Sequence, residues 1–507
     1  MGSWHTHTTD FLPIFAALYI INITIVNYHY NCLADIQADL RNGHITCRQL
    51  ALYYLERIEK NKHLNAYLEV YADEILAQAY DLDKRLASGA PMGRLFGMML
   101  GVKDVICYKQ HLVSAGSNIL KDFVSLYSAT AIERLLAEDA LLLGRLNCDE
   151  FAMGSTNENS AFGPVCNAAD PNKVPGGSSG GSAVAVQADL CTAALGSDTG
   201  GSVRQPAAFC GTIGVKPTYG RISRHGLIAY ASSFDQIGVL TRSVADAALL
   251  LEVMAGKDVF DSTSSSAPVP PYADMLHEPN TPKMRIAYFK EALHHQGLDS
   301  EIAQKTADML QSLADQGHIV AEVDFPLLQQ IVPTYYILTT AEASSNLSRY
   351  DGMRYGYRAA DAADMDSTYR KSRSQGFGKE VKRRIMLGTF VLSAGYYDAY
   401  YGKAQRVRRM IFDATQRILA DFDFIVTPTT PTTAFDIGDK AYQNPVSMYL
   451  ADIFTVQANL TGMPALSLPL FIHSNGLPFG LQIMADKFQE SKLLSFAQSL
   501  MKTELSN

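Results

Sequence analysis

Residues 174–214 read VPGGSSGGSAVAVQADLCTAALGSDTGGSVRQPAAFCGTIG, and this stretch carries the strongest structural and chemical signal in the chain. The part from Gly176 to Gly214 holds nine of the chain's 36 glycines in 39 residues, where an even spread would give about three. Flexible linkers also concentrate glycine and serine, but Ala183–Ala188 and Ala193–Leu195 are small and mostly apolar, which is typical of tightly packed elements. We therefore interpret the glycines as positions where the backbone comes close to a ligand or adopts positive φ.

Two serines stand at the turns of this stretch, each in front of an expected helix. Ser178 precedes Gly180-Gly181, and Ser202 follows Thr199-Gly200-Gly201. The N-terminus of a helix presents unpaired N–H groups and partial positive charge, which suits an oxyanion. The pattern therefore indicates acyl-transfer chemistry, with Ser202 expected as an exposed loop residue.

A serine nucleophile needs a base, and the sequence offers two arrangements. Gly177–Gly181 fits the G-x-S-x-G pattern around Ser179, but that arrangement requires a strand before the serine and a histidine after it. Pro175 is a poor residue for a central strand, and the late candidate His473 lies in a polar turn. The other available base is Lys103, which follows a short apolar run. The histidine arrangement is the poorer fit, and the residues alone leave the choice open.

Taken together, these residues resemble the amidase signature family. In that family a lysine in a G-V-K-D setting, a serine in G-G-S-S-G-G-S and a nucleophilic serine in G-S-D-T-G-G-S form a Ser–Ser–Lys triad. The matching positions are Lys103, Ser178 and Ser202, and the two serines are 24 residues apart, as the family's pattern requires. The resemblance also implies a cis peptide bond between Gly177 and Ser178.

The same resemblance implies an oxyanion hole and a fold. The backbone N–H groups around Thr199, Gly200, Gly201 and Ser202 correspond to the family's oxyanion hole. The family's fold is α/β, with a mixed central β-sheet covered by helices on both faces. No metal is expected at the site.

Longer motifs resemble one branch of that family, the A subunits of glutamyl-tRNA(Gln) amidotransferases. These motifs are GVKPTYGRISR at 214–224, ASSFDQIG at 231–238, DST at 261–263 and TPTTPTTAF at 427–435. The resemblance covers about residues 33–500 and implies that the chain hydrolyses glutamine. It further implies that the ammonia passes to a B subunit, which uses ATP and magnesium to activate Glu-tRNA(Gln), while a small C subunit braces the pair. No cofactor is expected in this chain.

Two charged residues match the positions that hold glutamine in that branch. Arg384 lies in VKRRIMLGT at 381–389 and corresponds to the arginine that binds the α-carboxylate. Asp452 lies in MYLAD at 448–452 and corresponds to the aspartate that binds the α-amino group. Arg383 is the neighbour most easily confused with Arg384. A free-standing amidase that acts on other small amides needs neither charge, and a dead scaffold subunit would be expected to have lost part of the triad.

Composition bounds the remaining functions. The chain has 43 Lys+Arg against 51 Asp+Glu, a net charge of −8, which disfavours stand-alone nucleic-acid binding and fits tRNA contact mainly through the B subunit. Its seven cysteines are an odd number without a C-x-x-C pair, so neither a disulfide framework nor a zinc site is indicated. We expect a reducing compartment and a cytoplasmic protein.

The first 32 residues read as an extension of unknown role in front of a single amidase domain at 33–507. Phe11–Val26 is a 16-residue apolar run, which is short of the roughly 18 residues expected of a membrane span. Residues 1–10 contain no Lys or Arg, and no A-x-A site follows the run, so a signal peptide also fits poorly. No membrane attachment is expected.

Local patterns favour an α/β sheet with helices on both faces. Thr46–Gln49 and Thr130–Glu133 both have the spacing of a capping box at a helix N-terminus. Ser243 is expected to open a further helix that Gly256 ends. Short apolar strands alternate with the helical stretches. They include Ile213–Lys216, Arg285–Phe289 and Phe424–Thr427.

Overall fold

One mixed sheet organises residues 31–507, which form one compact unit. The computed structural model describes residues 30–276, 282–440 and 451–504, so the expectations for residues 1–29 lie outside the described residues. Within these ranges the strand order is β1-β3-β2-β4-β6-β5-β10-β11-β9-β7-β8. The strands are β1 (Tyr67–Val70), β2 (Met99–Lys103), β3 (Leu141–Leu146), β4 (Ala193–Asp198), β5 (Ile213–Lys216), β6 (Gln236–Thr241), β7 (Arg285–Phe289), β8 (Ile319–Val323), β9 (Phe424–Pro428), β10 (Ala465–Ile472) and β11 (Pro478–Ala485).

The sheet is parallel in two places and antiparallel elsewhere. Strand β2 runs parallel to β3 and β4, and β7 runs parallel to β8 and β9. The remaining pairs, including β4 with β6 and β10 with β11, are antiparallel. The predicted mixed sheet is therefore confirmed. The parallel pairing of β2 with β4 brings Lys103, at the end of β2, close to the segment that follows β4.

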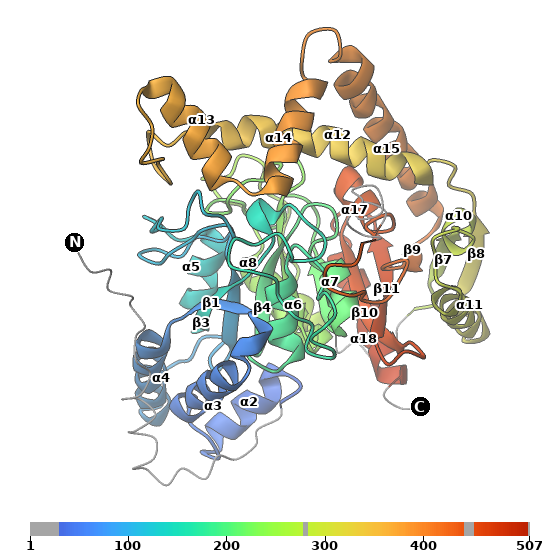
Figure 1. Ribbon diagram of the computed structural model, residues 1–507. Coiled ribbons are helices and arrows are strands. Elements are labelled where there is room, and N and C mark those ends of the chain that lie inside the picture. The colour runs from blue at the N-terminus through green and yellow to red at the C-terminus, as the bar shows by residue number, and fades with distance from the viewer. Residues whose placement is uncertain (1–29, 277–281, 441–450, 505–507) are drawn as a thin grey trace. The chain divides into compact units, whose positions relative to one another are not determined.

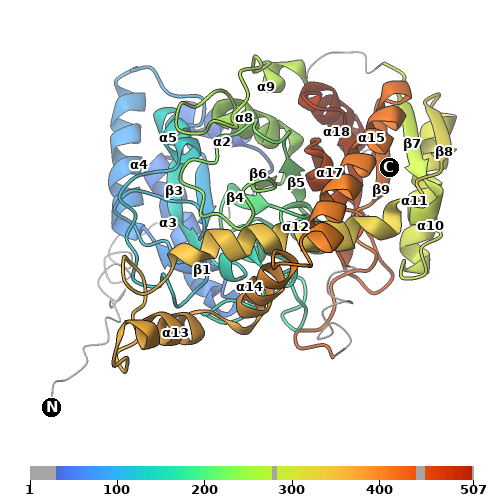
Figure 2. The ribbon, with the colours of Figure 1, turned by 90° about the horizontal axis from the view of Figure 1, so that it is seen from above.

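Helices cover both faces of the central strands, as predicted (Figure 1). Helices α6 and α7 contact each other and the central strands, as do α8 and α18, and Figure 2 shows α8 and α18 from above. The helices are α2 (Leu33–Arg41), α3 (Cys47–Lys60), α4 (Ala72–Ala87), α5 (Thr130–Ala137), α6 (Gly180–Gln187), α7 (Arg204–Cys210), α8 (Val244–Met254), α9 (Tyr272–Met275), α10 (Lys290–Leu293), α11 (Ser300–Asp315), α12 (Leu328–Asn346), α13 (Met365–Gly376), α14 (Lys379–Val391), α15 (Lys403–Asp421), α17 (Val456–Thr461) and α18 (Glu490–Glu504). Short helical turns are η1 (Lys62–Leu64), η2 (Glu150–Ala152), η3 (Leu347–Arg349) and the π-helical η4 (Asp398–Gly402). No helix in the described ranges is long and apolar enough to cross a bilayer.

Two of the three predicted N-terminal helix caps are confirmed and one is wrong. Thr46 caps α3 in a full capping box, and Ser243 caps α8 by accepting a hydrogen bond from the Asp246 backbone. The residue at the N-cap of α5 is Ala129, and Thr130 is the first helical residue. The Thr130 hydroxyl instead donates to Asp258, which a local pattern cannot reveal.

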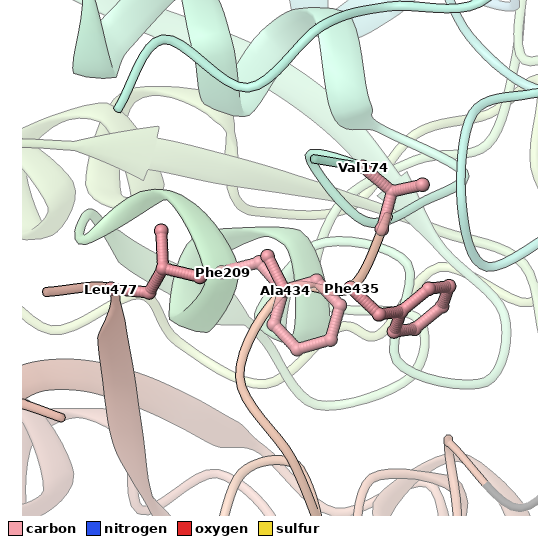
Figure 3. Close-up of a cluster of buried hydrophobic side chains, with 5 residues drawn as sticks. All are labelled: Val174, Phe209, Ala434, Phe435 and Leu477. Carbon is pink, nitrogen blue, oxygen red and sulfur yellow. The ribbon is translucent and has the colours of Figure 1, made fainter. Parts of the chain in front are cut away.

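A small apolar cluster fixes the segment that leads to Ser178 (Figure 3). It consists of Val174, Phe209, Ala434, Phe435 and Leu477, which come from four separate parts of the chain. The rings of Phe209 and Phe435 meet edge to face with centroids 6.0 Å apart. The Val174 backbone N–H donates to the Phe435 carbonyl at 2.9 Å. This packing anchors the chain four residues before Ser178.

Candidate active site

Lys103 is the centre of a buried cluster of hydroxyl groups. Its Nζ donates to the Oγ atoms of Ser178, Ser179 and Ser197 at 2.7, 2.8 and 2.9 Å. Ser178 and Ser179 stand just before α6, and Ser197 lies near the end of β4. The structure therefore brings Lys103 and Ser178, which are 75 residues apart in sequence, into direct contact.

The surroundings of Lys103 favour its neutral form. The side chain is fully buried, and burial lowers its pKa to about 8, although the nearby carboxyl groups of Asp149, Asp198 and Asp235 oppose this shift. A lysine with a pKa near 8 is partly unprotonated at neutral pH and can accept a proton. This makes Lys103 suited to act as a base on Ser178.

The backbone in front of Ser178 has the form that the family resemblance implies. The peptide bond between Gly177 and Ser178 is cis. The Gly177 N–H donates to the Gln205 side chain at 2.9 Å. A Cβ atom at position 177 would lie 2.2 Å from an Asp149 carboxylate oxygen, so only glycine fits there.

Ser202 lies on the loop between β4 and α7, close to the same segment. Its carbonyl accepts a hydrogen bond from the Ser179 N–H at 3.2 Å. Its hydroxyl makes no hydrogen bond to any residue in the described ranges 30–276, 282–440 and 451–504. Ser202 is 8% exposed, whereas Lys103 and Ser178 are 0% exposed. The expectation of an exposed loop serine is therefore wrong, because the surrounding loops cover it, but it is the most accessible of the three.

A buried ion pair that the sequence analysis missed shapes this loop. Asp198 accepts hydrogen bonds from the backbone N–H groups of Gly201 and Val203 at 2.9 and 3.1 Å. Its carboxylate also binds the Arg204 guanidinium at 3.0 and 3.1 Å. Burial alone would raise the pKa of Asp198, but the charge and hydrogen bonds of Arg204 outweigh burial and hold it at about 2. Asp198 is an acidic residue between an apolar strand and a glycine-rich turn. That position was the sequence signal that could have indicated its role in shaping the loop.

Asp198→Asn is expected to destabilise the protein by about 3–5 kcal/mol, because it leaves the buried Arg204 charge uncompensated. Urea unfolding would measure the loss, and Asp413→Asn in the exposed Arg409–Asp413 pair should change stability by less than about 1 kcal/mol. Folding lowers the pKa of Asp198. The contribution of Asp198 to the free energy of unfolding is therefore complete above its unfolded pKa of about 3.9 and is lost as pH falls toward 2. Equal effects of the two substitutions would contradict the structural role.

The expected oxyanion-hole residues are held by side chains from other segments. The Thr199 hydroxyl donates to Asp235 at 2.8 Å, and the Thr455 hydroxyl donates to the Gly200 carbonyl at 2.7 Å. Gly201 has φ +132°, and a Cβ atom there would lie 2.1 Å from the Thr455 hydroxyl. The Gly201 N–H already donates to Asp198, so Gly201 shapes the loop and is occupied as a donor.

The structure distinguishes Arg384 from Arg383. Arg384 is buried on α14, where Nε donates to Glu380 at 2.8 Å and Nη1 donates to the Tyr230 hydroxyl at 2.9 Å. The Arg383 side chain is 37% exposed and pairs with the other Glu380 oxygen. Adjacent helix residues point about 100° apart, so only one of the two can face the core. Arg384 follows Val381 by three residues and therefore shares its buried helix face. The inward position of Arg384 could have been predicted from this spacing.

Asp452 is buried within electrostatic reach of Arg384. It accepts a hydrogen bond from the Ser155 hydroxyl. Burial raises its pKa to about 7, while the Ser155 hydrogen bond and the charge of Arg384 act in the opposite direction. The Thr455 hydroxyl, which donates to Gly200, also lies 3.1 Å from the Asp452 carbonyl. Met448 and Tyr449 of the same motif lie outside the described residues.

Asp235 connects the Arg384 side of the site to the loop of Ser202, and the sequence analysis assigned it no role. Its carboxylate accepts hydrogen bonds from the backbone N–H groups of Tyr230 and Ala231, both at 2.9 Å, and from Thr199. Tyr230 in turn contacts Arg384. Arg384 is therefore connected to the loop of Ser202 through two intervening residues, Tyr230 and Asp235.

The histidine arrangement is not formed in the described residues. His473 contacts the carboxylates of Asp299 and Glu301, both at 3.3 Å. Ser179 is bound by Lys103 instead. The fold and the site therefore fit the amide-cleaving enzymes that the family resemblance implies, with a lysine rather than a histidine beside the serines.

Comparison with known proteins gives the same class. The chain belongs to the amidase family, because the family described as Amidase matches residues 49–494. The A subunit of glutamyl-tRNA(Gln) amidotransferase from Chlorobium phaeobacteroides (strain BS1) is 51% identical over 480 residues, which cover 94% of this chain and 99% of that protein. The protein of the same name from Chlorobaculum tepidum is 51% identical over 476 residues, 93% of this chain and 98% of that one.

Solved structures extend the likeness to enzymes with other names. The A subunit of glutamyl-tRNA(Gln) amidotransferase from Thermotoga maritima aligns with a TM-score of 0.74 at 38% identity, covering 90% of this chain and 91% of that one. The peptide amidase from Stenotrophomonas maltophilia aligns with a TM-score of 0.79 at 29% identity, covering 94% and 98%. The fold is thus shared by both kinds of enzyme, while sequence identity is higher to the amidotransferase protein.

Proposed function

We propose that the chain is the glutamine-hydrolysing subunit of a glutamyl-tRNA(Gln) amidotransferase. It releases ammonia from glutamine, and the ammonia converts Glu-tRNA(Gln) to Gln-tRNA(Gln). The observation that carries this proposal is the burial of Arg384 and Asp452 within electrostatic reach of each other, next to the loop of Ser202. The similarity to proteins named as this subunit supports it.

The two charges fit the backbone groups of a free amino acid. A guanidinium binds a carboxylate with paired hydrogen bonds, so Arg384 would hold the α-carboxylate of glutamine. Asp452 would hold the α-amino group, and the positive charge of that group would keep the Asp452 carboxylate ionised although burial raises its pKa. The side-chain amide of glutamine then extends toward Ser202.

The triad residues take distinct roles in the reaction. Neutral Lys103 accepts a proton from Ser178, which accepts one from Ser202. The Ser202 Oγ attacks the amide carbon, and the N–H groups of the loop at Thr199 and Gly200 stabilise the oxyanion. The proton returns to the leaving nitrogen, and ammonia departs. Water then cleaves the ester on Ser202 and releases glutamate.

The ammonia requires a partner that consumes it. We propose a B subunit that binds ATP, magnesium and most of the tRNA, and a C subunit that braces the complex. The net charge of −8 fits a chain that leaves most tRNA contact to its partner. The proposed setting is the cytoplasm, with residues 33–507 as one amidase domain and 1–32 as an extension.

The alternative is a free-standing amidase that acts on other small amides. The similarity in fold to a peptide amidase keeps this alternative open. A neutral amide has no α-carboxylate, so such an enzyme would gain nothing from the buried pair of Arg384 and Asp452. Whether substrate binding depends on Arg384 therefore distinguishes the glutamine-hydrolysing subunit from a free-standing amidase.

Arg384→Ala is expected to raise the KM for glutamine at least tenfold, because a charge-assisted contact to the substrate is worth about 1.5–3 kcal/mol. Steady-state glutaminase assays of the purified complex would measure it. Arg383→Ala is the matched control and should leave KM within about threefold, since its side chain is 37% exposed. Transamidation driven by added ammonia should survive in both variants. An unchanged KM in the Arg384 variant would favour the free-standing amidase.

A further inference from the structure

A turn rich in tyrosine joins α14 to α15 and carries an unusual amount of exposed apolar surface. Five of the 18 large apolar side chains that are exposed in the described ranges lie within residues 386–400. They are Met386, Phe390, Tyr396, Tyr397 and Tyr400, and we call them the tyrosine-rich surface. Figure 1 shows this turn at the end of α14 and α15 that lies farthest from the sheet. Single exposed apolar residues are normal, but a cluster marks a contact surface.

Three of these side chains, Phe390, Tyr396 and Tyr400, form one contiguous group of rings. The ring centroids of Phe390 and Tyr396 lie 4.5 Å apart, and those of Phe390 and Tyr400 lie 5.7 Å apart. Met386 precedes Phe390 by four residues and shares its helix face. Phe390, Tyr396 and Tyr400 are still 43%, 45% and 40% exposed. Part of each ring is therefore available to a partner.

The same segment is strongly basic, although the chain is acidic. Residues 379–410 hold eight Lys or Arg against two Asp or Glu, a net charge of +6, so the other 475 residues carry −14. Lys403, Arg406 and Arg409 are exposed at the start of α15, directly after the tyrosines. Aromatic residues, methionine and arginine are the types that are enriched at protein–protein interfaces.

We propose that the tyrosine-rich surface and its basic rim bind an acidic, partly apolar face of a partner subunit, an inference that rests on the proposed amidotransferase function. The charge favours an acidic protein, because opposite potentials steer association and fix orientation. A symmetric contact with a second copy would place the exposed basic side chains of Lys403, Arg406 and Arg409 against the same basic patch. RNA is disfavoured because the rest of the chain carries a net charge of −14, which repels a phosphate backbone.

The tyrosine-rich surface lies on the same helix as the proposed glutamine-binding arginine. Helix α14 carries Arg384 on its buried side and Met386 and Phe390 on its exposed side. A helix with side chains is about 10–12 Å across. A partner docked on the exposed side therefore lies one helix width from the proposed glutamine-binding arginine, close to where ammonia is made.

The test is titration of the purified B and C subunits encoded in the same genome with the full chain. Lys403→Glu combined with Arg406→Glu is expected to weaken binding at least 30-fold and to reduce its salt dependence. The matched control is Lys290→Glu combined with Lys305→Glu, which reverses the same charge at exposed positions on α10 and α11 and should leave affinity within about threefold. Phe390→Ser combined with Tyr400→Ser tests the contribution of the apolar side chains to subunit binding. Thermal unfolding checks that this variant is folded.

Each outcome has a distinct meaning. Equal affinity of the wild type and both surface variants would overturn this inference and leave the proposed function standing. Failure of the wild type to bind B and C subunits would overturn both. Normal subunit binding with lost tRNA binding, or a changed oligomeric state of the isolated chain, would overturn it by assigning the surface to RNA or to a second copy. Because both substituted lysine and arginine side chains are exposed, loss of folding would not explain weaker binding by that variant.

Discussion

Ser202→Ala, purified with its partner subunits, is expected to lose glutamine hydrolysis by a factor on the order of 10⁴ or more. The reason is that the Ser202 hydroxyl would form the covalent intermediate, and alanine cannot replace it. The fold should survive, because the hydroxyl makes no hydrogen bond within the described residues and its removal leaves no buried partner unsatisfied. Ammonia release from glutamine is the measurement.

Two further serine variants serve as controls for Ser202→Ala. Ser182→Ala removes a buried hydroxyl on α6 that donates to the Leu195 carbonyl on β4, and it should retain most activity. Ser179→Ala removes one of the three hydroxyl partners of Lys103, so a partial loss is expected. If the Ser202 variant kept more than a tenth of the activity, or if Ser179→Ala alone abolished it, the assignment of the nucleophile would be wrong.

Lys103→Arg is expected to be nearly as damaging as Lys103→Ala, with a loss on the order of 10³-fold or more. A guanidinium keeps its proton at any ordinary pH, so arginine would preserve the charge and lose the base. The buried position adds a steric cost, which the alanine variant does not share. Similar losses in the two variants, with thermal unfolding showing that the arginine variant is folded, would indicate that the missing function is proton transfer.

The pH dependence of the wild type tests the same role. Activity should rise with pH along a single limb centred near 8, because burial lowers the pKa of Lys103 to about 8 and the neutral amine is the active form. Lys216 is a second buried lysine, with its pKa lowered to about 7 by burial, and it donates to the Pro217 carbonyl. If the same rise of activity with pH is seen in Lys216→Met, Lys216 is not the group that causes it. Near-normal turnover in Lys103→Arg would show that position 103 supplies only charge.

Local sequence patterns predicted the elements well where neighbours in the chain determine them. The capping box at Thr46 and the cap at Ser243 are formed by residues within a few positions of each other. Thr130 has the same spacing, yet its hydroxyl donates to a carboxylate 128 residues away. The pattern therefore located the start of α5, but it predicts the cap itself correctly only when no distant group competes for the side chain.

The site could be predicted in part for the same reason. The G-V-K-D and glycine-serine motifs are continuous in the chain, so they located Lys103, Ser178 and Ser202 as candidates. The roles of Asp198 and Asp235 stayed hidden although each lies within a motif, because the motif does not show that the carboxylate holds a backbone loop. Ser197 likewise became a neighbour of Lys103 only through the pairing of β4 with β2.

The sequence by itself determined the α/β class, the amidase family resemblance and the positions of the candidate triad, because these depend on composition and on spacing along the chain. Only the tertiary structure decided that Arg384 faces inward while Arg383 remains partly exposed, and that Ser202 is covered rather than exposed. It also placed Asp452 within electrostatic reach of Arg384. Burial and electrostatic contact depend on which distant segments pack together, and spacing within one segment does not contain that information.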